Sequence, residues 1–389
     1  MRVCWLSYFP VEWLPEVPEP LRGLPRLHPA TWQRVLVQEL KGRADLKLHV
    51  IAVRKQFPRH VSFESEGVTF HCLKVPPGMR TLSLFWWETR LIRRCLRVIQ
   101  PDVVHAWGTE RGAALVAQRC GYPYLVTMQG LLNWCLESVE LGMAVRLEAM
   151  LERVSLRRAK VVTAESKFAV GWLERHYPHL EVRQVEHAPN WLFHKLDRQP
   201  ETKPLSFLYV GSLSELKGTD ILLRGLDKLR QEMDFRLMLV GSGAPEFVSG
   251  LKRSTSSALW ERITVRDGLT QAEVAQEMSR ATMVLFPTRV DNSPNSVKES
   301  VVAGVPVVGS AVGGLLDYVV PGRNGLRFAP GNLEEFISAI RSAAAHPFFS
   351  NGRVNEDTLR QMREYLSPRV MGEKFLGAYE RVRERRGEF

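Results

Sequence analysis

The sequence predicts an α/β protein with two doubly wound domains, each built on a mostly parallel sheet. Three observations support this fold class. Short apolar runs typical of buried strands alternate with amphipathic helical stretches along the chain. A length of 389 residues suits two or three domains that each bury a core. The polar segment 196–204, which contains two prolines, separates two such blocks and is the expected linker.

The first domain is expected to span residues 1–195. Its expected strands, in chain order, are MRVCWLSYF, LKLHVIAV, VTFHCLKV, DVVHAW, YPYLVTMQG, KVVTAE and VRQVEHAP. Helical stretches such as ATWQRVLVQELKG and TLSLFWWETRLIRRCLRVIQ lie between them. Strands and helices that alternate in this way imply right-handed crossovers and parallel strand pairing.

The second domain is expected over residues 205–366 and repeats the pattern. Its expected strands are LSFLYVG, FRLMLVGSG, ITVRDG, ATMVLFPT, VPVVGS and a weaker GLRFAP. Residues 367–389 predict an amphipathic helix, begun by Ser367-Pro368, that packs back toward the first domain. Two similar units are expected to hold a ligand between the carboxyl ends of their strands.

Composition and charge narrow the classes of protein. The start of the sequence shows no signal peptide, no apolar run is long enough for a transmembrane helix, and five cysteines without a CxxC pair favour a reducing cytosol. Residues 1–195 carry 27 Lys and Arg against 18 Asp and Glu, a net +9 of the total +11. The arginines at 90, 93, 94 and 97 form either a solvated helix face or a surface that attracts an anionic membrane or an acidic acceptor. No nucleic-acid-binding motif is present, so no nucleic acid partner is expected.

The most informative segment, residues 287–317, places Asp291 and Glu299 eight positions apart. Pro294 keeps the loop after Asp291 from being helical, and Glu299 then falls on the first turns of a helix that Gly304 can end. Two such carboxylates can hold hydroxyl groups at two points of an extended ligand. The residues of the intervening polar loop that are expected in the same site are Asn292, Ser293, Pro294, Asn295 and Ser296.

Three glycine-containing turns are candidates for binding a nucleotide. Gly313-Gly314 starts the next helix, where free N–H groups and the helix dipole can receive a phosphate. After a strand, Gly211-Ser212 leads to Lys217 just before a helix, a place where a diphosphate can be neutralised, although such a junction is often only a turn. Gly268-Leu269 ends another strand and is either a contact for a nucleotide base or a plain loop.

In the first domain, His105 is expected near a strand end that points toward the ligand, with Gln129 at the next strand end. A packed or surface histidine is the alternative. Trp107, Thr109 and Glu110 add polar and aromatic groups nearby.

The sequence lacks a DxD motif, so no metal is expected to hold the phosphates. It also lacks GxxxxGK[ST], HExxH and GxSxG, which disfavours P-loop, zincin and α/β-hydrolase chemistry.

Together these residues resemble the group 1 family of retaining glycosyltransferases with the GT-B fold, which has two Rossmann-like doubly wound domains facing a central cleft. The segment VGSL with the later KG looks like the family's "VGRL…KG", AGVPVV like its "AxGxPVV", and GGLLDYV like its "GGxxE". Upstream, PDVVHAWGTE and VTMQG look like "DvvHaHg" and "tvHG".

The resemblance implies sugar transfer from a nucleotide-diphosphate donor to an acceptor hydroxyl, with retained configuration and no metal or other cofactor. Glu299 is then expected to bind ribose, Asp291 the sugar hydroxyls, and Gly268-Leu269 the base. Lys217 and the Gly313-Gly314 amides are expected to bind the diphosphate, whose phosphate acts as leaving group and base.

Four departures from the family pattern stand out. Ser212 replaces a phosphate-binding arginine, Asp291 a glutamate and Gln129 a histidine. A proline-rich stretch over residues 8–32 replaces the glycine-rich loop after the first strand, and His28 and Thr31 are the candidates there.

The expected acceptor is a saccharide or a lipid-linked acceptor, as in polysaccharide or glycoconjugate biosynthesis. This predicts a cytoplasmic hexosyltransferase, peripheral at the inner face of a membrane through its basic first domain. The alternatives are a sugar-nucleotide epimerase of the same fold and a non-catalytic nucleotide-sugar-binding partner subunit.

Overall fold

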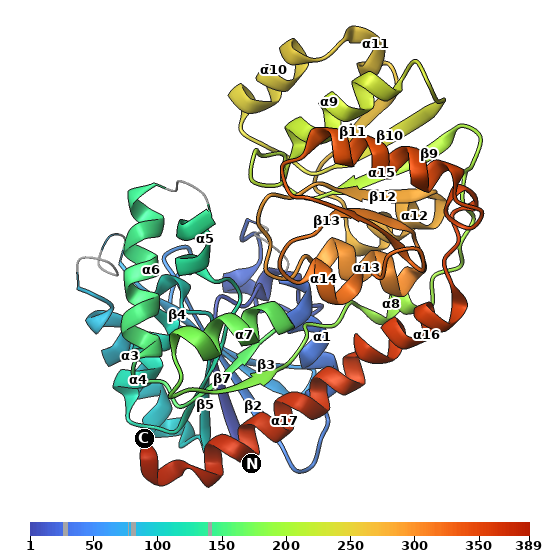
Figure 1. Ribbon diagram of the computed structural model, residues 1–389. Coiled ribbons are helices and arrows are strands. Elements are labelled where there is room, and N and C mark those ends of the chain that lie inside the picture. Colours follow the sequence, from blue (N-terminus) through green and yellow to red (C-terminus); the bar gives the residue numbers. More distant parts are fainter. Residues whose placement is uncertain (26–29, 77, 79–82, 139–141) are drawn as a thin grey trace. The chain divides into compact units, whose positions relative to one another are not determined.

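A computed structural model describes residues 1–25, 30–76, 78, 83–138 and 142–389 of the chain (Figure 1). The chain folds into two compact units, each around its own sheet. The first comprises Met1–Glu186 with Pro368–Phe389, and the second comprises His187–Ser367. The predicted α/β class with two doubly wound units is confirmed.

The first unit contains an eight-stranded sheet in the order β3-β4-β2-β1-β5-β6-β7-β8. Its strands are β1 (Arg2–Ser7), β2 (Lys47–Arg54), β3 (Val61–Ser65), β4 (Val68–Lys74), β5 (Val103–Trp107), β6 (Tyr124–Thr127), β7 (Val161–Ala164) and β8 (Glu181–Gln184). All neighbours pair in parallel except β3, which pairs antiparallel with β4 at the edge. The chain order reverses between β1 and β5, and such a switch point opens a crevice at the carboxyl ends of the strands.

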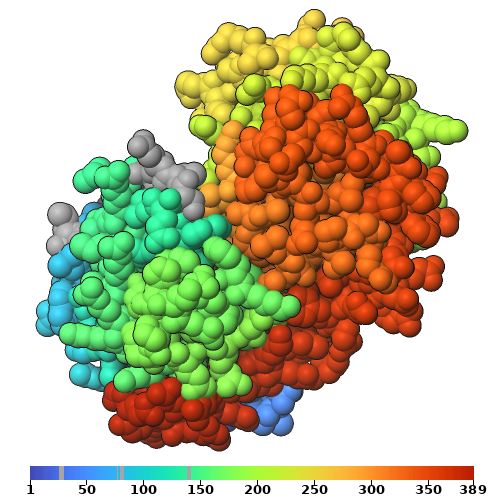
Figure 2. Space-filling view, viewed as in Figure 1, coloured from blue at the N-terminus to red at the C-terminus, as the bar shows by residue number. Residues whose placement is uncertain are grey.

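Helices cover both faces of this sheet, so its central strands read as continuous apolar runs. They are α1 (Thr31–Leu40), α3 (Trp86–Ile99), α4 (Ala113–Cys120), α5 (Leu132–Ser138), α6 (Met143–Leu156), α7 (Lys167–His176) and the C-terminal α17 (Pro368–Glu384). Helix α17 packs against α1 and against β5, β6 and β7. The space-filling view shows this last segment, in dark red, on the surface of the first unit (Figure 2).

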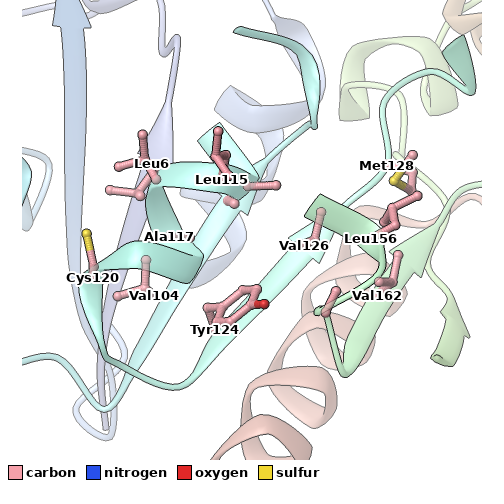
Figure 3. Close-up of a cluster of buried hydrophobic side chains, with 14 of the residues drawn as sticks. Leu6, Val104, Leu115, Ala117, Cys120, Tyr124, Val126, Met128, Leu156 and Val162 are labelled. Atoms are coloured by element: carbon pink, nitrogen blue, oxygen red, sulfur yellow. The ribbon is translucent and has the colours of Figure 1, made fainter. Parts of the chain in front are cut away.

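The core on the other face of the sheet is formed by side chains from alternating strands and helices. Leu6, Val104 and Val126 of β1, β5 and β6 meet Leu115 of α4, and all four are at most 5% exposed (Figure 3). Burial of each such aliphatic side chain contributes about 1.5–3 kcal/mol before the loss of conformational entropy is subtracted.

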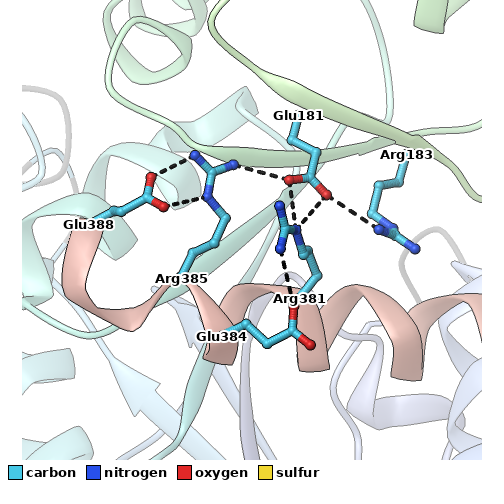
Figure 4. A network of polar contacts seen from close by, with 6 residues as sticks. All are labelled: Glu181, Arg183, Arg381, Glu384, Arg385 and Glu388. Carbon is cyan, nitrogen blue, oxygen red and sulfur yellow. Dashed lines mark hydrogen bonds and ion pairs between the residues drawn. The ribbon is translucent and has the colours of Figure 1, made fainter.

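A set of ion pairs ties the C-terminal end of α17 to strand β8 (Figure 4). Glu181 on β8 accepts hydrogen bonds from Arg381 Nε at 2.8 and 2.9 Å and from Arg385 Nη1 at 3.1 Å. Arg385 is in turn held by Glu388 through two contacts of 2.6 and 2.9 Å. Because these groups are partly exposed, the network orients the helix more than it stabilises the fold.

The second unit contains a six-stranded, fully parallel sheet in the order β11-β10-β9-β12-β13-β14. Its strands are β9 (Leu205–Val210), β10 (Phe235–Val240), β11 (Ile263–Arg266), β12 (Met283–Phe286), β13 (Val307–Ser310) and β14 (Gly325–Phe328). Its helices are α8 (Trp191–His194), α9 (Thr219–Leu229), α10 (Pro245–Ser254), α11 (Ser257–Trp260), α12 (Gln271–Arg280), α13 (Asn295–Ala303), α14 (Leu315–Tyr318), α15 (Leu333–Ala345) and α16 (Glu356–Tyr365). Here the switch point lies between β9 and β12.

The structure differs from the sequence-based expectation in two details. The short edge strand β3 was not expected. The division between the units falls after Glu186, before the expected linker, because the segment that follows packs into the second unit, where Phe193 is fully buried. Among the described residues, no helix is long and apolar enough to cross a membrane.

Candidate functional site

Two loops meet at the switch point of the second sheet. One follows β9 and the other follows β12, and they begin side by side because these strands are neighbours. The Arg289 N–H donates to the Leu216 carbonyl at 2.9 Å, and Thr288 Oγ1 donates to the same oxygen at 3.2 Å. The two loops therefore form one structure at the carboxyl end of the sheet, where α/β proteins bind ligands.

Lys217 and Asp291 form an ion pair within this structure. Lys217 Nζ lies 2.5 Å from Asp291 Oδ2, although the two residues are 74 positions apart. The side chains are 26% and 11% exposed, so the pair remains open to a ligand. The sequence placed both residues at one site, and the structure brings them together.

A second ion pair, between Arg289 and Asp220, joins the same loops. Arg289 reaches Asp220 at the start of α9 with two parallel hydrogen bonds of 2.7 and 2.8 Å. Such a bidentate pair fixes geometry as well as charge. It therefore orients the loop that carries Lys217 relative to the loop that carries Asp291.

Two glycines permit the close approach of these loops. A Cβ on Gly218, which has φ +69°, would lie 1.8 Å from the Pro287 carbonyl oxygen. A Cβ on Gly313, with φ +53°, would lie 1.8 Å from the Asp291 carbonyl oxygen. No other residue type fits without backbone movement, since both φ values also favour glycine.

The Gly313-Gly314 turn corrects one expectation. The Gly314 N–H donates to the Asn292 carbonyl at 2.8 Å, so it is not free to receive a phosphate. The Gly314 hydrogen bond holds the Asp291 loop in place, and phosphate binding by the Gly313 amide stays a prediction. The following helix, α14, has only four residues, which limits its dipole.

Glu299 lies on α13, only 8% exposed, as the start of this helix after Pro294 places it. Burial raises the pKa of its carboxyl to about 8, while Lys298 and the Gln271 amide act in the opposite direction. At neutral pH the group is therefore mostly protonated, and it can both donate and accept a hydrogen bond. That is the chemistry needed to hold a pair of hydroxyl groups.

The polar loop before α13 is ordered by its own hydrogen bonds. The Ser293 N–H donates to Asp291 Oδ1 at 3.2 Å, and Ser293 Oγ lies 2.8 Å from the Tyr318 hydroxyl. The other members are the buried Asn292 and Ser296, Pro294 as N-cap and Asn295 as first helical residue. These hydrogen bonds hold the loop that carries Asp291 in one conformation.

The two remaining predicted contacts flank this centre. Gly211 donates to the Val240 carbonyl at 3.0 Å, and the carbonyl of the exposed Ser212 accepts from the Tyr209 hydroxyl at 2.7 Å. Gly268 is exposed after β11, and the partly buried Leu269 packs on the core that contains α12 and α13. The first residue of α12 is Gln271, whose amide lies close enough to Glu299 to lower the pKa of that carboxyl.

In the first unit, the structure corrects the role expected for His105. This residue is 0% exposed, between the sheet and α17. Its Nδ1 lies 2.9 Å from the Tyr379 hydroxyl and its Nε2 lies 2.6 Å from Thr127 Oγ1. Both ring nitrogens are engaged in the core, so His105 is a packing residue and does not point toward a ligand.

A cavity of about 640 Å³ lies at the switch point of the first sheet. Gln129 lines it, as do the aromatic residues Tyr8, Trp32 and Trp107. Thr31, proposed from sequence, begins α1 beside this lining, and His28 lies outside the described residues. The cavity thus combines apolar walls with a few polar groups, as small-molecule sites do.

Glu110 is a functional candidate to which the sequence assigned no role. It lines the same cavity, and burial together with the nearby Glu152 raises its pKa to about 7. The Gly130 N–H donates to its Oε1 at 3.2 Å. The available signal was its position directly after a strand end in the sequence HAWGTE.

Comparisons with known proteins agree with this architecture. The family model described as "Glycosyltransferase Family 4" matches residues 31–192, and the one described as "Glycosyl transferases group 1" matches residues 204–346. D-inositol 3-phosphate glycosyltransferase 1 of Catenulispora acidiphila is 28% identical over 272 residues, which cover 63% of this chain and 64% of that protein. The chain thus spans less than two-thirds of the length of this curated relative.

Solved structures show the same fold at low identity. Sucrose-phosphate synthase from Thermosynechococcus elongatus superimposes with a TM-score of 0.80 at 17% identity, covering 98% of both chains. HepE from Anabaena, in complex with UDP-glucose, gives a TM-score of 0.72 at 13% identity, covering 98% of this chain and 100% of that one. With two matched family models and two Rossmann-like units, the chain belongs to the group 1 glycosyltransferases of the GT-B fold.

Proposed function

We propose that this protein is a retaining hexosyltransferase that moves a sugar from a nucleotide-diphosphate donor to an acceptor hydroxyl. The observation that carries the proposal is the Lys217–Asp291 pair at the switch point of the second sheet. In a nucleotide sugar the anomeric carbon is bonded to the second phosphate, so the sugar hydroxyls and the diphosphate are adjacent. An ammonium group beside a carboxylate matches that junction.

Each charged group then has a distinct task. Lys217 stabilises the negative charge that develops on the diphosphate as the bond to the anomeric carbon breaks. Asp291 accepts hydrogen bonds from the sugar hydroxyls. The acceptor oxygen forms the new bond on the face that the phosphate leaves, its proton passes to a phosphate oxygen, and the configuration is retained.

Glu299 and the Gly268-Leu269 turn would hold the nucleoside. A protonated Glu299 donates one hydrogen bond to the ribose and accepts another, which avoids placing a charge in a buried site. The nearness of Glu299 to Gln271, just after the Gly268-Leu269 turn, suits a ligand whose base and ribose are adjacent. The known complex of HepE with UDP-glucose supports a donor of this class.

We propose that no metal or other cofactor takes part. Within the described ranges, no group of three or more His, Cys, Asp or Glu side chains is arranged to hold a metal ion. The diphosphate charge then rests on Lys217 and backbone amides, because Ser212 supplies none. Turnover that is unchanged by a chelator would support this part of the proposal, and restoration by Mg²⁺ or Mn²⁺ would contradict it.

The cavity in the first unit is the proposed acceptor site. Its aromatic walls suit the faces of a saccharide or the stem of a lipid-linked acceptor, and Glu110 and Gln129 supply hydrogen bonds. On α3, Trp86 and Trp87 are 51% and 42% exposed beside exposed arginines. This surface suits peripheral contact with an anionic membrane, in keeping with a cytoplasmic role in polysaccharide or glycoconjugate synthesis.

A thermal-shift screen over nucleoside diphosphates and their sugars tests donor binding first, because a true ligand raises the unfolding temperature by mass action. Lys217→Ala should abolish the shift. The matched control is Lys228→Ala, whose exposed side chain pairs with Glu334 on the surface. An equal shift in wild type and Lys217→Ala would contradict the site.

Turnover and stereochemistry are then measured with the donor that binds. NMR of the product over time should show the anomeric configuration of the donor. Inverted product would refute the retaining mechanism. Tight donor binding without transfer to any of a broad set of saccharide and lipid-linked acceptors would indicate a non-catalytic protein instead.

A further inference from the structure

A second cavity of the first unit is independent of everything assigned above. It encloses about 420 Å³ and is formed by α5, α6, α7 and the segment after α7. Its lining residues are Asn133, Glu137, Arg153, Arg157, Trp172, His176, Tyr177 and His179. Most of the polar side chains among these are hydrogen-bond donors.

Two guanidinium groups dominate the charge of this cavity. Arg153 donates through Nε to Asn133 Oδ1, which positions it and leaves its terminal nitrogens available. Arg157 is exposed and forms no ion pair with any residue that the structure describes. Among the described lining residues Glu137 is the only carboxylate, so these residues carry a net positive charge.

Trp172 adds a buried donor without an acceptor. The residue is 4% exposed, and its Nε1–H is buried with no hydrogen-bond partner among the described residues. A buried N–H in this state is unfavourable by about 1–3 kcal/mol. Because this atom is not reached from the cavity, Trp172 contributes its ring as a wall and donates no hydrogen bond to a ligand there.

Two histidines complete the set. His176 stacks on Trp172 with ring centroids 4.0 Å apart, and its Nδ1 lies 2.8 Å from the Trp172 carbonyl oxygen. His179 places Nε2 3.0 Å from the Leu156 carbonyl oxygen. Because a carbonyl oxygen only accepts, both of these nitrogens carry hydrogen.

We propose that this cavity binds a small tetrahedral oxyanion, phosphate or sulfate, free or as the monoester of a small molecule. Guanidinium groups donate to such oxygens, and the one carboxylate among the described lining residues is too few for a divalent cation. The volume exceeds that of a free ion, which leaves room for an organic substituent against Trp172 and Tyr177. The site lies in the first unit and shares no residue with the donor or acceptor sites.

The test is equilibrium dialysis of the full chain with radiolabelled inorganic phosphate at low ionic strength. The Lys217→Ala background removes competing phosphate binding in the second unit. Arg157→Gln removes one charge at an exposed position, so the fold is retained. We expect an affinity loss of about tenfold or more, the usual effect of deleting a charged hydrogen-bond donor. Trp172→Phe keeps an aromatic wall of the cavity and should bind phosphate as the background protein does.

Arg158→Gln is the matched control, because Arg158 is the next residue, is exposed and does not line the cavity. It should bind phosphate within about twofold of the background protein, as expected for a contribution from long-range charge alone. Unchanged binding in Arg157→Gln, or an equal loss in Arg158→Gln, would overturn the proposal. Tighter binding of glucose 6-phosphate than of phosphate would identify a monoester as the ligand, and equal binding would identify the free ion.

Discussion

Replacement of Glu299 by glutamine should change how the stability of the protein depends on pH. The native carboxyl has a pKa of about 8 because it is buried, against an ordinary value of 4.5. Between these values the folded state binds more protons than the unfolded state, so the free energy of unfolding falls as pH rises. The difference of pKa, at about 1.4 kcal/mol for each pH unit, corresponds to about 5 kcal/mol over the whole window.

Most of this change falls in an accessible range. From pH 5.5 to pH 9 the wild type should lose about 3 kcal/mol through Glu299 alone. The Glu299→Gln variant has the same shape without the titration, so its stability relative to wild type should rise by that amount. The measurement is urea unfolding followed by far-UV circular dichroism at pH 5.5, 7 and 9, with the variant compared with wild type at each pH.

Comparison at matched pH cancels every other titrating group. Glu261→Gln is a suitable control, since Glu261 is exposed in the same unit. Its free energy of unfolding should differ from that of wild type by the same amount at all three pH values. If the free energy of unfolding of Glu299→Gln also differs from that of wild type by a constant amount, the carboxyl is not desolvated as described. The interpretation of Glu299 as a protonated ribose-binding group then fails as well.

Three further changes test the geometry. Asp291→Asn should lower kcat at least about tenfold, because a charged hydrogen-bond acceptor at the sugar is lost. Calorimetry should show little change in the affinity for a nucleoside diphosphate, and an unchanged kcat would contradict a role for Asp291 in the site. Gly313→Ala should lower the free energy of unfolding by about 2–4 kcal/mol, since its Cβ meets the Asp291 carbonyl, whereas Gly331→Ala, with φ +81° and open space, should lower it by about 1 kcal/mol. Tyr379→Phe should destabilise the protein to urea by about 1–3 kcal/mol by leaving Trp5 Nε1 and His105 Nδ1 without their partner, and intact stability would contradict this packing.

Local patterns were sufficient to predict the loop positions and every strand of the two sheets except β3. Strands with both faces buried have apolar runs of fixed length, and the Pro294 and Gly304 signals placed α13 and hence Glu299. The edge strand β3 was not predicted because only its last residue is buried, so its sequence contains no apolar run. The expectation of one site for Lys217 and Asp291 came from the family resemblance, since a contact over 74 positions has no local signal.

The failures have a common physical origin. The packing of His105 depends on Tyr379, which lies 274 positions later and covers that face of the sheet. Likewise the Gly314 N–H is occupied by a carbonyl from a different loop. In both cases a distant segment decides whether a polar group faces a ligand or the protein interior. The raised pKa of Glu110 also follows from burial by several elements, not from its neighbours in sequence.

The assignment of α17 to the first unit has a consequence for biosynthesis. Trp5 on β1 donates through Nε1 to the Tyr379 hydroxyl at 2.9 Å, so this strand meets its partner only after α17 has been made. The second unit, by contrast, is one continuous stretch, His187–Ser367. Domains generally fold as units during synthesis. The second unit can therefore complete its fold on the ribosome while one face of the first sheet is still exposed, because α17 has not yet been made. We expect chaperones and proteases to bind the protein at that exposed face during synthesis.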